Sequence, residues 1–280
     1  MHTCIQELIP NSISPRLNQG HPCFSTGRHL KAGRIHLPVA PACNISCNYC
    51  VRKFDCANES RPGVTSKLVT PEEALGLVRE AKESAIGPYL NVVGIAGPGD
   101  PLANPTTFET LALVREHFPD LALCLSTNGL LLPEKINDLV SLGVSHLTVT
   151  VNALNEDTAS AIYRYIHWQG QTLIGHDAAR VLLENQLLGI KLASEAGMTI
   201  KVNTVVIPGL NDYGLEALAW EVKRRGAHLL NLLPLIPQGK FRHHTSPTPP
   251  EMLNHRQRLA SILPQMTHCQ QCRADAIGLV

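Results

Sequence analysis

The sequence predicts an α/β fold, a full or partial (β/α)6 barrel built around six parallel strands. Three observations support this prediction. Short runs rich in aliphatic and β-branched residues alternate with longer segments of helical periodicity, as βα units around a parallel sheet do. The length of 280 residues suits a single α/β barrel. No linker rich in glycine, serine or proline divides the chain.

The predicted elements follow one another in regular alternation. Helix 71–84 has the clearest start, because Thr70 is a good N-cap and a proline occupies the first helical position. Segment 238–250, with His243, His244 and several prolines, is predicted to be an exposed loop before a last helix. The predicted strands are 34–40, 90–96, 121–127, 146–152, 199–206 and 228–235, and the other helices are 106–117, 133–142, 178–196 and 215–225.

We divide the chain into an N-terminal extension (1–33), a barrel (34–237) and a C-terminal extension (238–280). The first extension carries Cys23, and the second carries Cys269 and Cys272. Both extensions are expected to close the site at the carboxyl ends of the strands, where barrels of this kind have their active sites.

Polar residues recur at every second position of three predicted strands. Residues two apart share a face of a strand, so each of these strands has one polar line. The alternation could also mark a sheet with one wet face, but strands flanked by helices are normally covered on both faces. We therefore expect the polar lines to face a lumen that holds a polar ligand. They comprise Cys124, Ser126, Asn128, Thr148, Thr150, Asn152, Lys201 and Asn203.

Composition excludes several classes of function. Hydrophobic residues make up 44% and the formal net charge is +1, so no basic field is available to attract nucleic acid or an anionic membrane. The first 20 residues have neither a basic nor a continuous apolar region of a secretory signal, and no stretch is long enough to span a bilayer. We expect a cytoplasmic protein, whose nine cysteines are metal ligands or free thiols rather than disulfides.

Cys43, Cys47 and Cys50 form a C-x3-C-x2-C loop directly after the first predicted strand. Three cysteines satisfy three corners of a four-iron cluster and leave one iron open, for which S-adenosylmethionine (SAM) is the natural occupant. Tyr49, between the last two thiols, is placed to lie against an adenine. Alternatives are a zinc site or unrelated free cysteines, but structural zinc sites usually show paired C-x2-C elements and four protein ligands.

Further candidate ligands occur along the chain. Cys56 and Cys124 could both reach a second cluster at the barrel mouth. His36 shares the first strand and imidazole can bind iron, although a lone histidine in a strand is more often a core residue. Cys4 is expected to be a free thiol.

Cys269 and Cys272 form a C-x2-C pair that Cys23 could complete. Alternatives are a redox dithiol or a zinc site that includes His268. A thioredoxin-type motif would lie between a strand and a helix, whereas this pair follows a helix, so metal binding is favoured.

Two short motifs contain further candidate site residues. Gly97, Gly99 and Asp100 follow the second strand, where glycines let the backbone approach a ligand closely. After a cysteine loop, this turn is the expected contact of the amino group of SAM. Glu59 and Arg61 follow Cys56 and are either catalytic or a surface ion pair.

The combination of these motifs resembles the NifB family of radical SAM proteins, which build the carbide-centred precursor of the nitrogenase cofactor. The resemblance runs from His21 to Asp275. Many radical SAM enzymes have the cysteine loop, but few share the other matching segments. Those segments are 39–44, 55–63, 94–104, 125–129, 148–153 and 202–212. Val51 and Phe54 depart from the polar residues expected in relatives, and the chain ends without the carrier-like C-terminal domain of some members.

The resemblance implies that the fold is a radical SAM partial barrel and that two four-iron clusters are substrates. It implies that His36, Cys56 and Cys124 hold one substrate cluster, and that Cys23, Cys269 and Cys272 hold the other. A first SAM would methylate a sulfide, and a radical from a second SAM would take hydrogen from that methyl. Loss of protons, cluster fusion and addition of one sulfur would give an [8Fe-9S-C] cluster.

The resemblance also assigns roles and partners. Glu59 and Arg61 are the candidate catalytic residues, with Glu59 either handling protons or guiding ligand exchange. The expected partners are an iron–sulfur cluster donor, a reductant such as ferredoxin or flavodoxin, and a downstream cofactor carrier or scaffold. Competing hypotheses are a radical SAM enzyme that modifies a peptide or small molecule, and a non-catalytic iron–sulfur carrier. The candidate SAM-binding residues are Tyr49, Gly97, Gly99, Asp100, Ser126, Asn128, Thr150, Asn152 and Val206.

Overall fold

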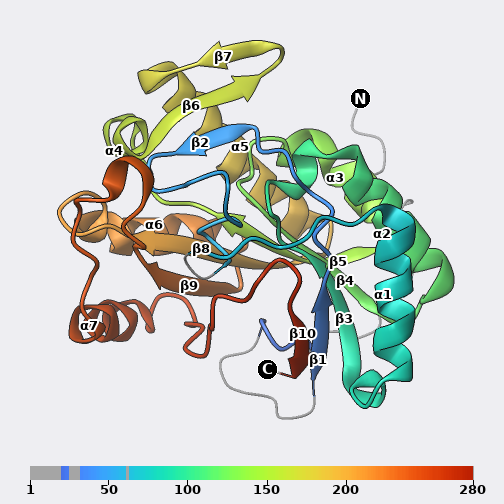
Figure 1. Cartoon of the computed structure of the whole chain (residues 1–280). Coiled ribbons are helices and arrows are strands. Elements are labelled where there is room, and N and C mark those ends of the chain that lie inside the picture. The colour runs from blue at the N-terminus through green and yellow to red at the C-terminus, as the bar shows by residue number, and fades with distance from the viewer. Residues whose placement is uncertain (1–19, 25–31, 61–62, 280) are drawn as a thin grey trace.

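The computed structural model describes residues 20–24, 32–60 and 63–279. The predictions for Cys4 and Arg61 lie outside these residues. The predicted fold class is confirmed. Six parallel strands occur in chain order in one curled sheet, with helices on its outer side (Figure 1).

The main sheet has the strand order β10-β1-β3-β4-β5-β8-β9. Neighbouring strands from β1 to β9 are parallel, and only β10 runs antiparallel, beside β1. Each predicted strand is present with its ends shifted by a few residues at most. The strands are β1 (Gly33–His36), β3 (Leu90–Ile95), β4 (Ala122–Thr127), β5 (Val144–Thr150), β8 (Thr199–Val206), β9 (Leu229–Pro234) and β10 (Ile277–Leu279).

The helices pack on the sheet through their apolar sides. At the start of α1, Thr70 accepts a hydrogen bond from the backbone N–H of Glu73, and the Glu73 carboxylate accepts one from the Thr70 N–H, forming a capping box. Fully buried Leu125 and Leu147 in the strands belong to the same core as Leu111 of α2. The helices are α1 (Pro71–Glu83), α2 (Pro105–His117), α3 (Leu132–Ser141), α4 (Glu156–Ile162), α5 (Gly175–Glu195), α6 (Leu215–Arg224) and α7 (Pro249–Leu259).

A second, three-stranded sheet was not predicted. It pairs β2 (Ile45–Cys47) with a hairpin of β6 (Tyr163–Trp168) and β7 (Gln171–Leu173), in the order β2-β6-β7. The hairpin turns at Gln169 and Gly170, both of which have positive φ, as the favoured two-residue hairpin turns require. The cysteine loop is thus part of a small sheet stacked at the mouth of the barrel (Figure 1).

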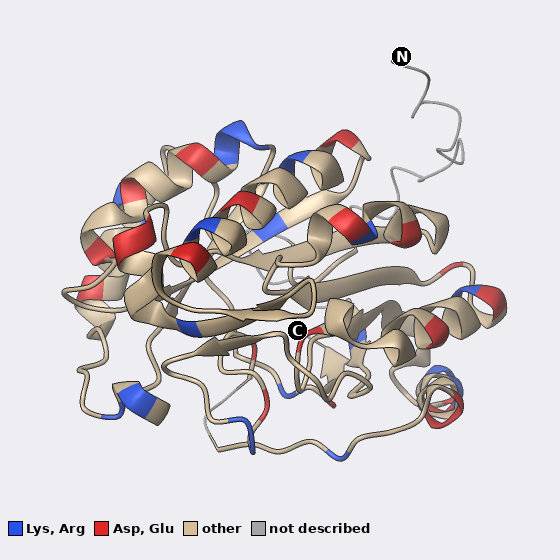
Figure 2. Cartoon of the chain, turned by 90° about the horizontal axis from the view of Figure 1, so that it is seen from above, with Lys and Arg blue, Asp and Glu red and all other residues tan. Residues whose placement is uncertain are grey.

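Charged residues of both signs are interspersed over the outer helices (Figure 2). The outer helices therefore carry no large patch of a single charge, in keeping with the net charge of +1. Among the described residues, no helix combines the length and apolar character needed to cross a bilayer. The division into two extensions and a barrel stays a prediction.

Candidate active site

The first cavity of the site has a volume of about 470 Å³ and lies at the carboxyl ends of the strands. Thr127 and Thr150, the last residues of β4 and β5, form part of its wall. The cysteine loop forms another part. Lining residues from this loop and its flank are Cys43, Cys47, Tyr49, Cys50 and Arg52.

Backbone hydrogen bonds from distant segments hold the cysteine loop in place. The Asn48 N–H donates to the carbonyl of Ile162 at 2.8 Å, and the Asn48 carbonyl accepts from Lys240 at 2.7 Å. Cys47 itself lies in β2, opposite Tyr163 of β6. The conformation of the loop therefore depends on the second sheet and on the segment after β9.

The three thiols of the loop match the donors of an iron–sulfur cluster. They are free, and burial raises the pKa of Cys43 to about 12 and also raises the pKa of Cys47 and Cys50. Within the described ranges, no three His, Cys, Asp or Glu side chains converge closely enough to hold a single metal ion. A cluster of several irons separates its ligand sulfurs more widely than one ion does, so this donor set fits a cluster.

The glycine-rich turn after β3 packs directly on the cysteine loop. A Cβ atom on Gly99 would lie 2.0 Å from the carbonyl oxygen of Ala42, so only glycine fits there. The Gly99 N–H donates to the Ala40 carbonyl at 2.5 Å, and the Asp100 N–H donates to the Ala42 carbonyl at 2.8 Å. Arg52 donates to the carbonyls of Pro41 and Pro98 and so joins the same two segments.

Asp100 organises the end of β4 through its buried carboxylate. The carboxylate accepts hydrogen bonds from the N–H groups of Leu102 and Asn128, at 3.0 and 2.6 Å, and from the Thr127 hydroxyl. Burial raises the Asp100 pKa to about 6, although these bonds favour the charged form. The Asn128 amide donates to Asn44 at 2.7 Å, so this network connects β4 to the cysteine loop.

Tyr49 points into a buried polar network beside the first cavity. Its hydroxyl donates to the Asn58 side chain at 2.7 Å and accepts from the Asn152 amide at 2.8 Å. The Asn152 amide also donates to the Tyr163 hydroxyl, and its carbonyl oxygen accepts from the Val205 N–H. These bonds tie the cysteine loop to the ends of β5 and β8.

The predicted SAM-binding residues are distributed unevenly over this site. Tyr49, Gly99, Asp100, Ser126, Asn128 and Thr150 line the first cavity. Gly97, Asn152 and Val206 are not among its lining residues, and Val206 is fully buried in the hydrophobic core. The contact of all nine residues with SAM stays a prediction.

A second cavity of about 340 Å³ lies deeper between the strands. It brings together side chains from the N-terminal segment, β1, β4 and β8. Among them are Cys23, His36, Cys124 and Lys201, together with Thr148 of β5. The expected polar lumen is therefore present, because Cys124, Ser126, Thr148 and Lys201 line this cavity.

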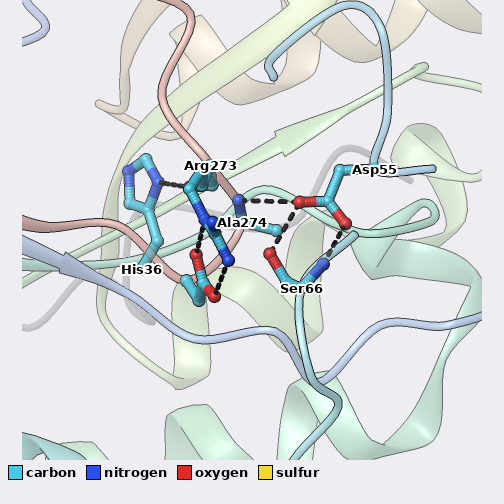
Figure 3. A network of polar contacts seen from close by, with 6 residues as sticks. His36, Asp55, Ser66, Arg273 and Ala274 are labelled. Atoms are coloured by element: carbon cyan, nitrogen blue, oxygen red, sulfur yellow. Dashed lines mark hydrogen bonds and ion pairs between the residues drawn. The ribbon is translucent and has the colours of Figure 1, made fainter. Parts of the chain in front are cut away.

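His36 is oriented as a metal ligand would be. Its Nδ1 lies 3.1 Å from the carbonyl oxygen of Arg273 and donates to it, which leaves the lone pair on Nε2 (Figure 3). Burial and the Arg34 charge lower the His36 pKa to about 4, so the ring is neutral at pH 7. A Cβ on Gly94 would lie 2.9 Å from the Cys124 sulfur and 3.5 Å from His36 Nε2. Gly94 thus leaves room for one group to meet both donors.

The other predicted cysteine ligands do not all lie at one cavity, and their places do not follow their order in the sequence. Cys56 lines the first cavity, beside the cysteine loop, and the cysteine charges there help burial to raise its pKa. Cys23 lines the second cavity, where Cys272 and Cys269 add to the burial that raises its pKa. Cys272 accepts a hydrogen bond from the Arg34 guanidinium. The assignment of these cysteines to two clusters of three ligands each stays a prediction.

Glu59 lies between the two cavities and lines both. Its Oε1 accepts hydrogen bonds from Ser126 at 2.5 Å and from Asn203 at 2.7 Å. Burial raises the Glu59 pKa, although Lys201 and these two bonds oppose the rise. Ser126 and Ala96 also line both cavities, so these three residues form the partition between them.

Sequence reasoning missed several residues in or beside the second cavity. Arg34 and His21 were not singled out, and Lys201 was noted only as part of a polar line. The residue type alone does not distinguish a buried cation from a surface one. The position of Lys201 two residues before Asn203 was the one available signal, because it places the lysine on the lumen face.

Comparison with known families gives a match over most of the chain. The model of the radical SAM superfamily matches residues 37–219. Solved structures support the fold alone, because their sequence identity is low. Streptococcus suis SuiB has a TM-score of 0.60 at 12% identity, covering 89% of this chain and 52% of that one. A second structure, anSMEcpe with bound AdoMet, has a TM-score of 0.51 at 17% identity, covering 80% and 58%.

Closer relatives are found among curated sequences. The FeMo cofactor biosynthesis protein NifB of Klebsiella pneumoniae is 48% identical over 267 residues, covering 93% of this chain and 57% of the relative. The NifB protein of Chlorobaculum tepidum is 45% identical over 265 residues, covering 94% and 62%. The chain thus spans less than two thirds of the length of these relatives.

Proposed function

We propose that this chain, which belongs to the radical SAM superfamily and is homologous to NifB along nearly its whole length, acts in nitrogenase cofactor biosynthesis. The proposed reaction fuses two [4Fe-4S] substrate clusters and inserts a SAM-derived carbide and one further sulfur. The product is an [8Fe-9S-C] cluster. The observation that carries this proposal is the pair of thiol-lined cavities with Glu59 in the partition between them.

The first cavity would hold the resident cofactors. Cys43, Cys47 and Cys50 would bind a [4Fe-4S] cluster, with Asn128 and Thr150 on the facing wall toward SAM. When bound, the cluster and SAM supply a 5′-deoxyadenosyl radical that can take hydrogen from carbon. The protein contributes position and exclusion of water, because the turn at Gly99 and the Tyr49 network fix the loop.

The second cavity would hold a substrate cluster. His36 Nε2 and the Cys124 thiolate would bind iron on the two sides of Gly94. Cys56 would complete this set of three ligands. Cys23, Cys269 and Cys272 would hold the other substrate cluster, near the C-terminal segment. Sets of three ligands or fewer leave irons exchangeable, which suits a cluster that must later leave.

Glu59 would accept a proton during carbide formation. Loss of protons from a methyl carbon needs a base between the radical source and the methylated cluster. Glu59 lies on the wall that both cavities share, and Ser126 and Asn203 fix its Oε1. Its raised pKa matches a carboxylate that takes and returns protons. Arg61 stays a candidate for the same step.

Partners follow from the chemistry of the proposed reaction. An iron–sulfur cluster donor would supply the two substrate clusters, and a ferredoxin or flavodoxin would supply electrons. A carrier or scaffold would receive the product. The reaction involves neither nucleic acid nor a membrane.

Anaerobic reconstitution tests the proposal. Three four-iron clusters correspond to about 12 irons per chain. With SAM labelled in its methyl group, we expect label in an acid-labile cluster and 5′-deoxyadenosine as a product. About four irons per chain, or label recovered only in a peptide or small molecule, would contradict the proposal. No 5′-deoxyadenosine under reducing conditions would instead indicate a carrier.

A Glu59→Gln variant separates the steps of the reaction. We expect it to bind all the iron, to transfer the methyl group and to form less than about 1% of the carbide product, since loss of a general base costs about 10²–10⁴-fold. Unchanged carbide formation would remove Glu59 from the proton-transfer step.

A further inference from the structure

Among the side chains that the structure describes, two hydrogen-bond donors at or beside the second cavity, Arg34 Nε and His21 Nε2, are buried without a partner, and Lys201 is a buried cation without an ion pair. Buried polar groups are almost always hydrogen-bonded, and buried charges are almost always paired. Three side chains at or beside this cavity depart from that rule: Arg34, Lys201 and His21. An arrangement of this kind is complementary to an anionic ligand.

Arg34 is a buried cation beside this cavity, close enough for its charge to act on the lining residues Cys23 and His36. It lies in β1 two residues before His36 and therefore shares the lumen face of the strand. The residue is 5% exposed, one guanidinium nitrogen donates to the Cys272 sulfur, and its Nε is buried without a partner. No carboxylate of the described residues lies within ion-pair distance of it.

Lys201 is the second cation and lines the cavity directly. The residue is 5% exposed, and its ammonium group contacts the Met266 sulfur at 3.9 Å and the Phe24 ring at 5.1 Å. Glu59 shares the cavity, but its Oε1 is bonded to Ser126 and Asn203. In the part of the chain that the structure describes, Lys201 has no ion pair.

His21 adds a neutral donor. Its Nδ1 accepts a hydrogen bond from the Cys23 N–H at 3.1 Å, so the neutral ring carries its proton on Nε2. The residue is 3% exposed, and Nε2 is buried without a partner. His21 also lines the second cavity.

We propose that Arg34, Lys201 and His21 form an anion-recognition site for the sulfide face of a thiolate-bound [4Fe-4S] substrate cluster in the second cavity. The two cations offset the negative charge of cluster and thiolates, and His21 donates to a sulfide. This inference rests on the proposed function, since it takes the second cavity as a substrate-cluster site. Hydrogen bonds and nearby charges are also the means by which proteins set the reduction potential of such clusters.

A neutral replacement of Lys201 should have opposite effects on the empty and the loaded protein. Without a cluster, Lys201 is a buried charge with no counter-ion, and its removal stabilises the fold. With a cluster, the same removal takes away an attraction. We expect Lys201→Met to raise the melting temperature of the metal-free protein by about 2–4 °C. We expect its iron content after reconstitution to fall from about 12 to about eight per chain.

The potential of the cluster gives a readout that a merely structural role would not change. A cation stabilises the reduced, more negative state, so the midpoint potential of any auxiliary cluster that Lys201→Met retains should be lower than in wild type. Lys201→Arg keeps the charge and should keep the iron. Lys191→Met removes an exposed lysine of α5, paired only with Glu195 at 3.7 Å, and should change none of these quantities.

A Lys201→Met protein with full iron content and an unchanged potential would overturn the proposal. So would a variant that loses iron but melts lower than wild type when metal-free, because that would be a folding defect. If wild-type protein itself holds only about four irons, the proposed function fails instead. The metal-free melting temperatures would then still decide whether Lys201 is a buried cation that lacks a counter-ion.

Discussion

Gly99 and Asp100 shape the first cavity by holding the cysteine loop. Gly99 brings the turn after β3 within backbone contact of Ala42, and the Asp100 carboxylate joins that turn to the end of β4. Both were predicted to contact SAM, and both line the cavity. The contacts in the structure show that Gly99 and Asp100 also hold the cysteine loop in position.

Gly99→Ala tests this mechanical role. The added Cβ would lie 2.0 Å from the Ala42 oxygen, a backbone atom that cannot rotate away. We expect a loss of about 3 kcal/mol or more in the free energy of unfolding, measured by urea denaturation of the metal-free protein. Gly76→Ala is the matched control, since no atom lies near its Cβ position in α1, and it should gain about 0.5–1 kcal/mol. Equal stabilities of the two variants would contradict this account.

His146 provides a prediction for pH dependence. The residue is fully buried against the rings of His21 and Phe24, and its pKa is lowered to about 4, chiefly by burial. The unfolded chain binds a proton near pH 6.5, whereas the folded protein does so only near pH 4. This contribution to stability is therefore complete above about pH 6.5 and is lost as the pH falls to about 4.

His146→Gln should remove that contribution. The loss of stability between pH 7 and pH 4 should be smaller in the variant by about 3 kcal/mol, measured by denaturant unfolding of the metal-free protein at each pH. His243→Gln, at an exposed position, serves as the control and should keep the wild-type dependence. A variant that follows the wild-type curve would show that His146 titrates normally in the folded state.

At the scale of elements, the repeated βα units could be predicted from the sequence, but the elements that complete the site could not. The strands β1 to β9 of the main sheet have apolar runs that local sequence reveals. In contrast, β10 has three residues and owes its pairing with β1 to contacts across the whole chain. The β6–β7 hairpin had a signal in its Gln-Gly turn, but its alternation of aromatic and polar residues was not recognised.

In the site, too, features formed by residues close in sequence could be predicted, and features formed by distant residues could not. Cysteine spacing predicted the loop of Cys43, Cys47 and Cys50, because these thiols are close in sequence. The surroundings of His36 depend on Arg273, which is distant in sequence, so its orientation could not be predicted. Lys201 and Arg34 have side chains that are usually exposed, and only the packing of strands shows that they are buried.

The C-terminal segment is attached to the cluster region by Asp55. Its carboxylate accepts hydrogen bonds from the N–H and hydroxyl of Ser66, at 2.9 and 2.6 Å, and from the Ala274 N–H at 3.3 Å (Figure 3). The side chain thus joins the loop that carries Cys56 to the segment that follows Cys272. The position of the C-terminal cysteines depends on this connection.

Asp55→Asn should loosen that segment selectively. An amide offers one acceptor oxygen in place of two, and we expect a loss of about 1–3 kcal/mol. Hydrogen exchange should increase in residues 268–279, and iron content should fall while the SAM-sensitive cluster is retained. Asp275→Asn weakens a partly exposed ion pair with Arg273 and a contact with Ser66, and should cost at most about 1 kcal/mol. Unchanged exchange in this segment would exclude Asp55 as its anchor.

At the scale of the whole molecule, burial favours the protonated form of seven thiols in the metal-free protein. Burial raises the pKa of seven of the cysteines that the structure describes, and the two cavities hold nearly all of them. Iron binds the thiolate, so each cysteine ligand must lose a proton when a cluster is loaded. Loading is therefore coupled to pH.

We expect cluster loading at pH 7 to release about one proton for each cysteine that binds, and to proceed further at pH 8 than at pH 6.5. Proton release can be measured with an indicator dye in weak buffer, and loading by iron content. A variant with Cys43, Cys47 and Cys50 all changed to Ala should release about three protons fewer. Equal release by this variant and wild type would mean that the three thiols do not bind the cluster.

The pairing of β10 with β1 cannot form until both strands have been synthesised. Gly33 and Leu279 are neighbours in the sheet although they are far apart in the sequence, so Leu279 is synthesised long after Gly33. The cysteine loop and its supports, up to Phe241, are made before Cys269, Cys272 and the carbonyl that orients His36. Under the proposed function, the cysteines of the first iron centre are therefore synthesised before the chamber proposed for the substrate clusters can be completed, because that chamber also needs Cys269, Cys272 and Arg273.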